Sequence, residues 1–395
     1  MMDKPILLKG MQIYSEKNQF YTGYIKITNQ KISEIGRLED LQDITDAVVF
    51  DLQENLTAVP GFIDVHIHGA AGADVMDGTE SALMTMANTL PAEGTTSFLA
   101  TTMTQEQEEI EKALKSAAGY MSKPQPEGRA EILGVHLEGP FVNKEMAGAQ
   151  PSQYIIDPDV ELFKKWENLS QGNIKLVTLA PERPGGKELA SYLSSKSIVA
   201  SIGHSNATYE EVKDSIEAGC THVTHLFNQM RGLHHREPGV AGAALLHDEL
   251  MVEVIADGVH VKPEMVKLAF KQKGEEGLIL ITDSMRAKCL KNGQYDLGGQ
   301  DVTVADGKAV LQDGTLAGSI LRLGHAVKNM IEFTGCSLED AIQMASVNPA
   351  KQLGVFDRKG SLAAGKDADI VILNEEHDVV MTLCRGEVAY RKENE

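Results

Sequence analysis

The chain has 395 residues and a formal net charge of −20, with 42% hydrophobic and 24% charged residues. This composition is typical of a globular enzyme, and the length predicts one large domain with a smaller one. The negative charge argues against nucleic acid and anionic membranes as partners, because either would require a basic face. No segment is long and apolar enough to span a membrane or to act as a signal peptide, so we predict a cytoplasmic location.

The two ends of the chain share one pattern. Residues 1–56 and 357–395 contain short strand-like segments separated by glycines and polar turns. Neither end has enough apolar residues for a core of its own. We therefore predict that they combine into one small β-sandwich domain around the continuous middle of the chain.

The middle of the chain, residues 57–356, alternates strand and helix patterns. The candidate strands are 57–64, 95–101, 131–137, 174–180, 197–203, 221–225, 251–256 and 277–282, with helical patterns such as 80–93, 105–121, 209–218 and 263–273 between them. These units predict an α/β fold, a (β/α)8 TIM barrel that forms the catalytic domain. A doubly wound sheet is the alternative, but no glycine-rich phosphate fingerprint follows the first strand.

Two histidines, His66 and His68, stand at the end of the first predicted barrel strand. Side chains alternate along a strand, so both point to the same side and can bind one metal ion. The spacing alone is a weak signal, because two histidines at a strand end can also be structural. The residues at the ends of the other predicted strands decide between a metal site and structural histidines.

Polar residues end the other predicted strands as well. In a barrel the active site is assembled from the carboxyl ends of the strands, so these residues should face one mouth. They are Glu138, His204, His225, the Asp257–His260 segment and Asp283. Four imidazoles and two carboxylates at matching strand ends predict a metal site rather than core packing.

Ligand chemistry suggests a role for each residue. Imidazole and carboxylate suit a divalent metal, and two metals need a bridging group, for which Glu138 is the candidate. We expect His66 and His68 to hold one metal with Glu138, and His204 and His225 to hold the other. Asp283, also counted among the ligands, would take a proton from water and deliver it to the leaving group. For His136 and His222 we expect supporting positions behind the ligands or in the core.

Seven motifs along the chain, in order, resemble the amidohydrolase superfamily and, within it, the N-acetylglucosamine-6-phosphate deacetylase family. They are Pro60–Gly69, His136–Pro140, Gly203–His204, Thr224–Met230, Arg236–Gly239, Ala256–His260 and Ile281–Asp283. The resemblance implies hydrolysis of N-acetyl-D-glucosamine 6-phosphate to D-glucosamine 6-phosphate and acetate in amino-sugar catabolism.

By the same resemblance, Glu138, His204 and His225 match the family's metal ligands and Asp283 its catalytic acid and base. The substrate positions are matched by Asn228 and Gln229 for the phosphate, Arg236 reaching it from the other subunit of a homodimer, His260 for the sugar, and Ala317 in the acetyl pocket loop.

Two positions vary within the family. His66 and His68 are absent from some members, and their presence here favours two metals per subunit. Gln150 stands where some members have a histidine that polarises the acetyl carbonyl, and since glutamine cannot be cationic, a metal must contribute more of that polarisation.

The sequence leaves several questions open. The metal could be Zn or Fe, with Mn and Co also acceptable to this ligand set. An N-acetylgalactosamine-6-phosphate deacetylase would need the same residues. Another amidohydrolase acting on a cyclic amide or dipeptide has no need of the Asn228 and Arg236 cluster, and a non-enzymatic scaffold would be expected to have lost ligands, of which none is missing.

Overall fold

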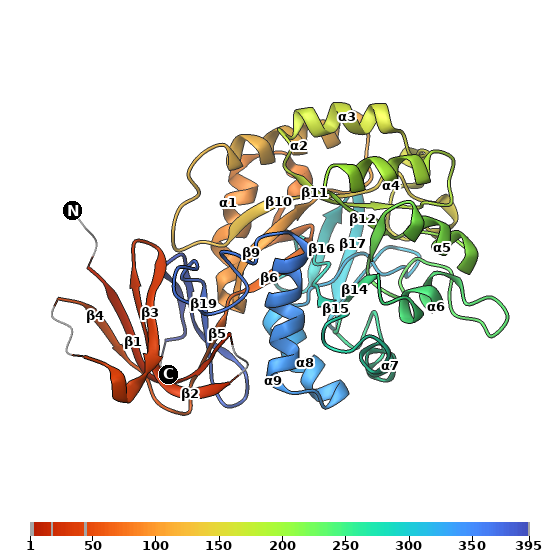
Figure 1. Ribbon diagram of the computed structural model, residues 1–395. Helices are drawn as coiled ribbons and strands as arrows, with labels where there is room; N and C mark the ends of the chain where they lie inside the picture. The colour runs from red at the N-terminus through yellow and green to blue at the C-terminus, as the bar shows by residue number, and fades with distance from the viewer. Residues whose placement is uncertain (1–3, 17–18, 43–45, 394–395) are drawn as a thin grey trace.

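The computed structural model describes residues 4–16, 19–42 and 46–393, and two large sheets organise them (Figure 1). The first is parallel, with neighbours in the order β6 (Phe62–Ile67), β9 (Thr95–Thr101), β10 (Glu131–Glu138), β11 (Ile174–Leu179), β12 (Val199–Ile202), β13 (Cys220–Val223), β14 (Met251–Val254) and β15 (Leu278–Leu280). Its two edges also meet, because Ile67 and Ser284 form a parallel bridge and the Asp283 N–H donates to the His66 carbonyl at 2.8 Å. The sheet is therefore curled, and we call it the barrel sheet.

Helices cover the outside of the barrel sheet (Figure 1). They are α1 (Glu80–Thr89), α2 (Gln107–Met121), α3 (Val160–Leu169), α4 (Gly186–Ser195), α5 (Tyr209–Glu217), α6 (Gly239–Leu246), α7 (Pro263–Lys273), α8 (Leu323–Thr334), α9 (Leu338–Ile342) and α10 (Asn348–Gln352). Among the described residues, none of the helices is long and apolar enough to cross a membrane. The predicted α/β class and alternation of strands and helices are confirmed.

Along β10, apolar side chains that pack in the core alternate with polar side chains that face the interior of the barrel. Val135 and Leu137 belong to the apolar core, whereas His136 and Glu138 contact polar side chains of other strands. The interior of the barrel is thus polar, and its outer surface packs against the helices.

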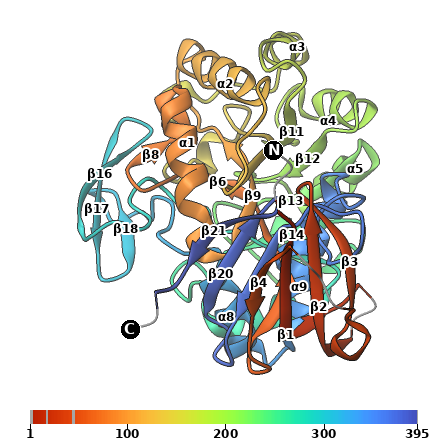
Figure 2. The same ribbon diagram turned by 90° about the vertical axis from the view of Figure 1, so that its left-hand side faces the viewer.

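The second large sheet, which we call the terminal sheet, combines both ends of the chain. Its order is β21 (Glu387–Arg391), β20 (Val379–Cys384), β19 (Ile370–Leu373), β5 (Thr57–Pro60), β1 (Ile6–Tyr14), β2 (Phe20–Thr28) and β3 (Lys31–Arg37), with β4 (Val48–Asp51) also paired to β1. Figure 2 shows the red N-terminal strands beside the blue C-terminal ones. The prediction that the two ends combine is confirmed in this respect, while the domain boundaries stay a prediction.

The predicted sandwich is not confirmed, because the terminal strands form one hydrogen-bonded sheet that forks at β1. Residues 6–9 of β1 pair with β4, whereas Gln12 and Ile13 pair with β5. A register shift between Lys9 and Gln12, with Gly10 at φ +92°, redirects the strand. Local bulge geometry of this kind is not readable from strand patterns.

The predicted strand 57–64 is in fact two strands, β5 in the terminal sheet and β6 in the barrel sheet. Gly61 separates them. A Cβ at this position would lie 2.1 Å from Thr96 Oγ1, so only glycine lets the chain pass so close to β9. One continuous apolar run therefore supplies strands to both sheets.

Two small antiparallel elements were not predicted. One is the hairpin of β7 (Gly69–Ala70) and β8 (Ala73–Asp74), and the other is the three-stranded insert of β16 (Gly293–Leu297), β17 (Gln300–Ala305) and β18 (Lys308–Val310). The insert stands at the side of the barrel, at the left of Figure 2. Gln105 Nε2 donates to the Gly298 carbonyl at 3.1 Å, and Gln300 Nε2 donates to the Ala149 carbonyl at 2.7 Å. These contacts hold the insert against loops that follow β9 and β10.

A buried charge network joins the barrel sheet to the terminal sheet. Glu131 at the start of β10 contacts Lys359 Nζ at 2.8 Å and accepts two hydrogen bonds of 2.9 Å from Arg358, while Lys359 also pairs with Asp369 beside β19. Burial alone raises the pKa of the Glu131 carboxyl, but the charges of Lys359 and Arg358 outweigh it and lower the pKa to about 2. The carboxylate therefore stabilises the fold in its ionised form.

Replacing Glu131 by glutamine is expected to lower the free energy of unfolding at pH 7 by on the order of 2–3 kcal/mol. Because the pKa is depressed from 4.5 to about 2 in the folded state, this stabilisation is present above about pH 4.5 and is lost as the pH falls toward 2. Melting temperatures of both proteins from pH 7 downward measure the difference, with Glu375→Gln in the exposed turn after β19 as the control. A difference that stays constant over this pH range contradicts the assignment.

Candidate metal centre

Glu138, the last residue of β10, lies at the centre of the imidazoles predicted from the sequence. Its Oε1 is 3.2 Å from Nε2 of His204 and 3.2 Å from Nε2 of His225, and its Oε2 is 3.2 Å from Nε2 of His68. The Nε2 atom of His66 lies 3.4 Å from Oε1. One carboxylate therefore faces all four predicted histidine ligands.

Asp283 completes the group from the other side of the barrel mouth. Its Oδ1 lies 3.5 Å from His66 Nε2 and 3.3 Å from His68 Nε2. The ligand atoms fall into two triads, each with its atoms within 4.8 Å of one another: His66, His68 and Asp283, and Glu138, His204 and His225. Asp283 therefore joins the first histidine pair, and Glu138 also lies close to it, 3.4 Å from His66 Nε2 and 3.2 Å from His68 Nε2.

Hydrogen bonds orient the imidazoles as metal ligands. His204 Nδ1 donates to the Met146 carbonyl at 2.7 Å, so its Nε2 carries a lone pair directed at Glu138. His225 Nε2 lies only 3.1 Å from that nitrogen. His66 Nδ1 lies 2.9 Å from Glu253 Oε2, and its Nε2 has no hydrogen-bond partner in the part of the chain that the structure describes. Buried nitrogens brought together in this way fit a shared cation.

The electrostatics of the centre favour positive charge. Burial alone lowers the pKa of His66, but Glu138, Glu253 and Asp283 outweigh it and raise the pKa well above the ordinary value. Burial raises the pKa of Asp283, but the neighbouring His66 and His68 lower it overall. The ionised carboxylates around these imidazoles therefore stabilise a positive charge at the centre. This donor set of imidazole nitrogens and carboxylate oxygens suits Zn, Fe, Mn or Co.

Three of the ligands adopt a strained backbone conformation. His204, His225 and Asp283 have φ values of +48°, +31° and +47°. Residues with side chains rarely adopt this region, and such strain is concentrated at functional sites. Each ligand lies just beyond the end of a barrel strand, where the chain turns sharply and directs the side chain into the mouth.

A pocket beside the two triads contains most of the predicted substrate residues. Its lining includes Gln150, Asn228, Gln229 and His260 together with His68, Glu138, His204, His225 and Asp283. Gln150 Nε2 donates to Glu138 Oε2 at 2.7 Å, while its Oε1 accepts from the Thr104 N–H at 2.8 Å. Gln150 thus fixes the orientation of Glu138 as well as facing the pocket.

A model of the amidohydrolase family matches residues 57–389. The chain belongs to the amidohydrolase family. It is 49% identical to an N-acetylglucosamine-6-phosphate deacetylase of Bacillus subtilis, over 98% of each chain. It is also 36% identical to an N-acetylgalactosamine-6-phosphate deacetylase of Escherichia coli O157:H7, over 91% of this chain and 97% of that protein. A crystal structure of N-acetylglucosamine-6-phosphate deacetylase from Thermotoga maritima superposes with a TM-score of 0.87 at 38% identity, covering 98% of this chain and 100% of that one.

Two predicted substrate residues of this amidohydrolase do not line the pocket. Ala317 is fully buried in the apolar core beneath the insert, although its neighbours Leu316 and Gly318 reach the pocket. Arg236 lies on an exposed loop, where its Nη1 is 2.7 Å from His235 Nε2. Within a single chain, Arg236 is therefore outside the site.

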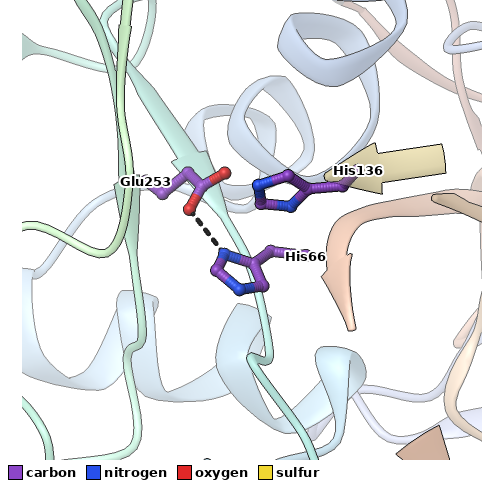
Figure 3. A group of neighbouring side chains, drawn as sticks. All are labelled: His66, His136 and Glu253. Atoms are coloured by element: carbon purple, nitrogen blue, oxygen red, sulfur yellow. Dashed lines mark hydrogen bonds and ion pairs between the residues drawn. The ribbon is translucent and has the colours of Figure 1, made fainter. Parts of the chain in front are cut away.

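Asp257, which the sequence placed at a strand end without a role, holds His260 through contacts of 2.7 Å to Nδ1 and 2.8 Å to its N–H. Other residues of the site were missed, among them Met103 and Leu297, which add apolar surface to the pocket. Glu253 in β14 contacts His66 from behind (Figure 3). A signal for Glu253 was present, since a carboxylate between Val252 and Val254 in a buried strand requires polar partners.

Proposed function

We propose that this amidohydrolase hydrolyses the acetamido bond of N-acetyl-D-glucosamine 6-phosphate, releasing acetate and D-glucosamine 6-phosphate. The observation that carries the proposal is the convergence of His204 Nε2 and His225 Nε2, 3.1 Å apart, on one oxygen of Glu138. The name of the Bacillus subtilis relative, at 49% identity over 98% of the chain, supplies the substrate. Together they support a cation-dependent deacetylase.

Each residue of the centre has a distinct part in the proposed reaction. The two triads would hold divalent cations, which lower the pKa of water and polarise the substrate carbonyl. Asp283 in its ionised form, which neighbouring divalent cations would favour, can accept the proton of the attacking water. The same carboxyl then delivers that proton to the leaving nitrogen, because an amine leaves readily only after protonation. Gln150 keeps Glu138 oriented through the contact of 2.7 Å.

Other polar groups that line the same pocket would position the substrate. Asn228 and Gln229 offer amide donors to the phosphate, and His260, which Asp257 holds in place, faces the sugar. An acidic chain needs a local cation for a phosphate, and Arg236 is the candidate. We propose that it acts across the interface of a homodimer. In support, Arg236 is exposed and Leu233 on the same loop and Leu246 at the end of α6 are 59% and 62% exposed.

A galactosamine epimer as substrate is the second candidate, because one relative is named for that activity. The test is acetate release from the 6-phosphates of N-acetylglucosamine and N-acetylgalactosamine, each with added Zn, Fe, Mn or Co. A kcat/KM that is higher for the gluco epimer supports the first proposal. Hydrolysis of a cyclic amide or dipeptide, with neither sugar accepted, contradicts both. The cytoplasmic location stays a prediction.

We expect two divalent cations per chain, because the two triads offer separate ligand sets. Elemental analysis of protein prepared with excess metal measures the number. His68→Asn removes a ligand of one triad only, so it should lower the number by one and leave the cation held by Glu138, His204 and His225. A wild-type value that stays at one, and that His68→Asn does not change, contradicts the expectation.

A further inference from the structure

Glu253 is a buried carboxylate in the middle of the polar barrel interior. It lies on β14, between β13 and β15, and is completely excluded from solvent. A buried ionised group is tolerated only when hydrogen bonds replace its water. The partners of Glu253 therefore indicate its role.

A single oxygen of Glu253 contacts one ligand of each triad. Its Oε2 is 2.9 Å from Nδ1 of His66, in the first triad, and accepts the backbone N–H of His225, in the second, at 3.1 Å. Figure 3 shows the contact between Glu253 and His66 as a dashed line, with His136 beside them. The other oxygen, Oε1, is 3.2 Å from Nε2 of His222. Both triads are thus connected through one atom.

The two contacts fix different properties of the ligands. Oε2 accepts the His225 N–H and is therefore an acceptor toward His66 as well, so the His66 proton lies on Nδ1 and Nε2 is left free to bind a cation. At His225 the contact instead fixes the backbone, where φ is +31° and the strand turns into the loop. The Leu226 N–H donates to the backbone carbonyl of Glu253 at 2.9 Å and strengthens the same junction. One side chain therefore controls a tautomer in one triad and a strained backbone in the other.

A third cation held by His66, His136 and Glu253 is the competing interpretation, since their ligand atoms also lie within 4.8 Å of one another. The distance between His66 Nδ1 and Glu253 Oε2 opposes it, because 2.9 Å is that of a direct hydrogen bond. His136 Nε2 contacts Thr178 Oγ1 at 2.7 Å, which orients the ring. The His136 ring packs edge-on against His66, with centroids 4.5 Å apart. Mutual orientation accounts for these contacts without a further ion.

We propose that Glu253 is a positioning residue that couples the two triads, so that loss of its carboxylate weakens cation binding at both. This inference rests on the proposed metal centre but not on the identity of the substrate. The number of cations bound by the wild-type protein is measured first, which separates failure of the metal centre from failure of the coupling. If the wild type holds one cation, the same variants must weaken that one, because Oε2 contacts a ligand of either triad.

The experiment compares Glu253→Leu, which keeps volume but removes both acceptors, with Glu253→Gln, which keeps one acceptor oxygen. Zn2+ affinities are measured by competition with a chromogenic chelator, and folding is checked by circular dichroism. The loss of such a supporting group typically weakens metal binding about 10- to 100-fold, and we expect this at both sites in Glu253→Leu. Glu253→Gln should be weakened only several-fold, since neutral hydrogen bonds are weaker than charge-assisted ones. At saturating Zn2+, kcat should fall in the leucine variant while KM changes little.

His222→Gln is the matched control, because His222 contacts the other oxygen of Glu253 and neither triad. We expect it to bind Zn2+ as the wild type does. The proposal is overturned if Glu253→Leu weakens the binding of only one of two cations. It is also overturned if His222→Gln weakens Zn2+ binding as much as Glu253→Leu does. If Glu253→Leu does not fold, the glutamine variant decides, and unchanged Zn2+ affinity in that variant overturns the proposal as well.

Discussion

Replacing Asp283 by asparagine is expected to lower kcat about a hundredfold to ten-thousandfold, the usual cost of losing a general acid and base. Asparagine keeps the size of the side chain and can still hydrogen-bond, but it cannot carry a proton between water and the leaving nitrogen. The two contacts of Asp283 with His66 and His68, at 3.5 and 3.3 Å, make it a member of the first triad. KM should change little, because the polar groups proposed for sugar and phosphate lie in the loops that follow other strands, β13 and β14.

The measurement is steady-state acetate release at full cation occupancy, which elemental analysis verifies for each preparation. Asp301→Asn on the exposed strand β17 is the matched control and should leave kcat unchanged. A near-normal kcat in Asp283→Asn means that another group moves the proton, and His260 is then the next residue to test. A fall in kcat that added metal reverses means that Asp283 acts only as a ligand.

Replacing Arg236 by alanine is expected to raise KM for the 6-phosphate sugar about tenfold to a hundredfold, the effect of losing a charge-assisted hydrogen bond. KM for unphosphorylated N-acetylglucosamine should not change, since that sugar lacks the anion. Arg37→Ala, in the exposed end of β3, controls for the general loss of one positive charge. Equal effects of Arg236→Ala on both sugars would show that the loop, and not the phosphate contact, depends on this arginine.

Mixing the two impaired variants, at substrate concentrations well below the wild-type KM, tests whether the arginine acts across a dimer. A mixed dimer of Arg236→Ala and Asp283→Asn chains has one site with both residues intact, so activity should recover to about a quarter of the wild-type value after random exchange. No recovery, although exchange of subunits is demonstrated by mass, contradicts the shared site. Size-exclusion chromatography with light scattering measures the oligomeric state of each preparation.

The proximity of the candidate ligands was predictable, because residues far apart along the chain meet where a barrel sheet closes. Once His66, Glu138, His204, His225 and Asp283 are assigned to the ends of parallel strands, closure of the sheet brings them together. The contact of Asp283 with His66 and His68 was not predictable, because it depends on how far each side chain extends past its strand. Glu253 was missed for a related reason. Its role depends on one side-chain oxygen that contacts residues following two other strands. Strand patterns in the sequence do not show how those strands are aligned with β14.

The terminal sheet was predicted only in outline. Alternating apolar residues at both ends indicated strands that need each other, and the shared sheet agrees. The fork at β1 depends on a bulge around Gly10, and the division between β5 and β6 depends on a close approach at Gly61. Both are backbone effects that involve partners far away in the sequence. The insert β16–β18 was missed because its short polar strands have few apolar residues.

The pairing of β5 with β19 affects the order in which strands can pair while the chain is being synthesised. Thr57 pairs with Leu373, so this edge of β5 must wait until nearly the whole chain has left the ribosome. The barrel strands β6 to β15 emerge earlier and can close first, whereas β1 to β5 keep an unpaired strand edge throughout. A chain that ends before β19 would therefore contain all the candidate metal-binding residues but would still expose the unpaired edge of β5, which is prone to aggregation.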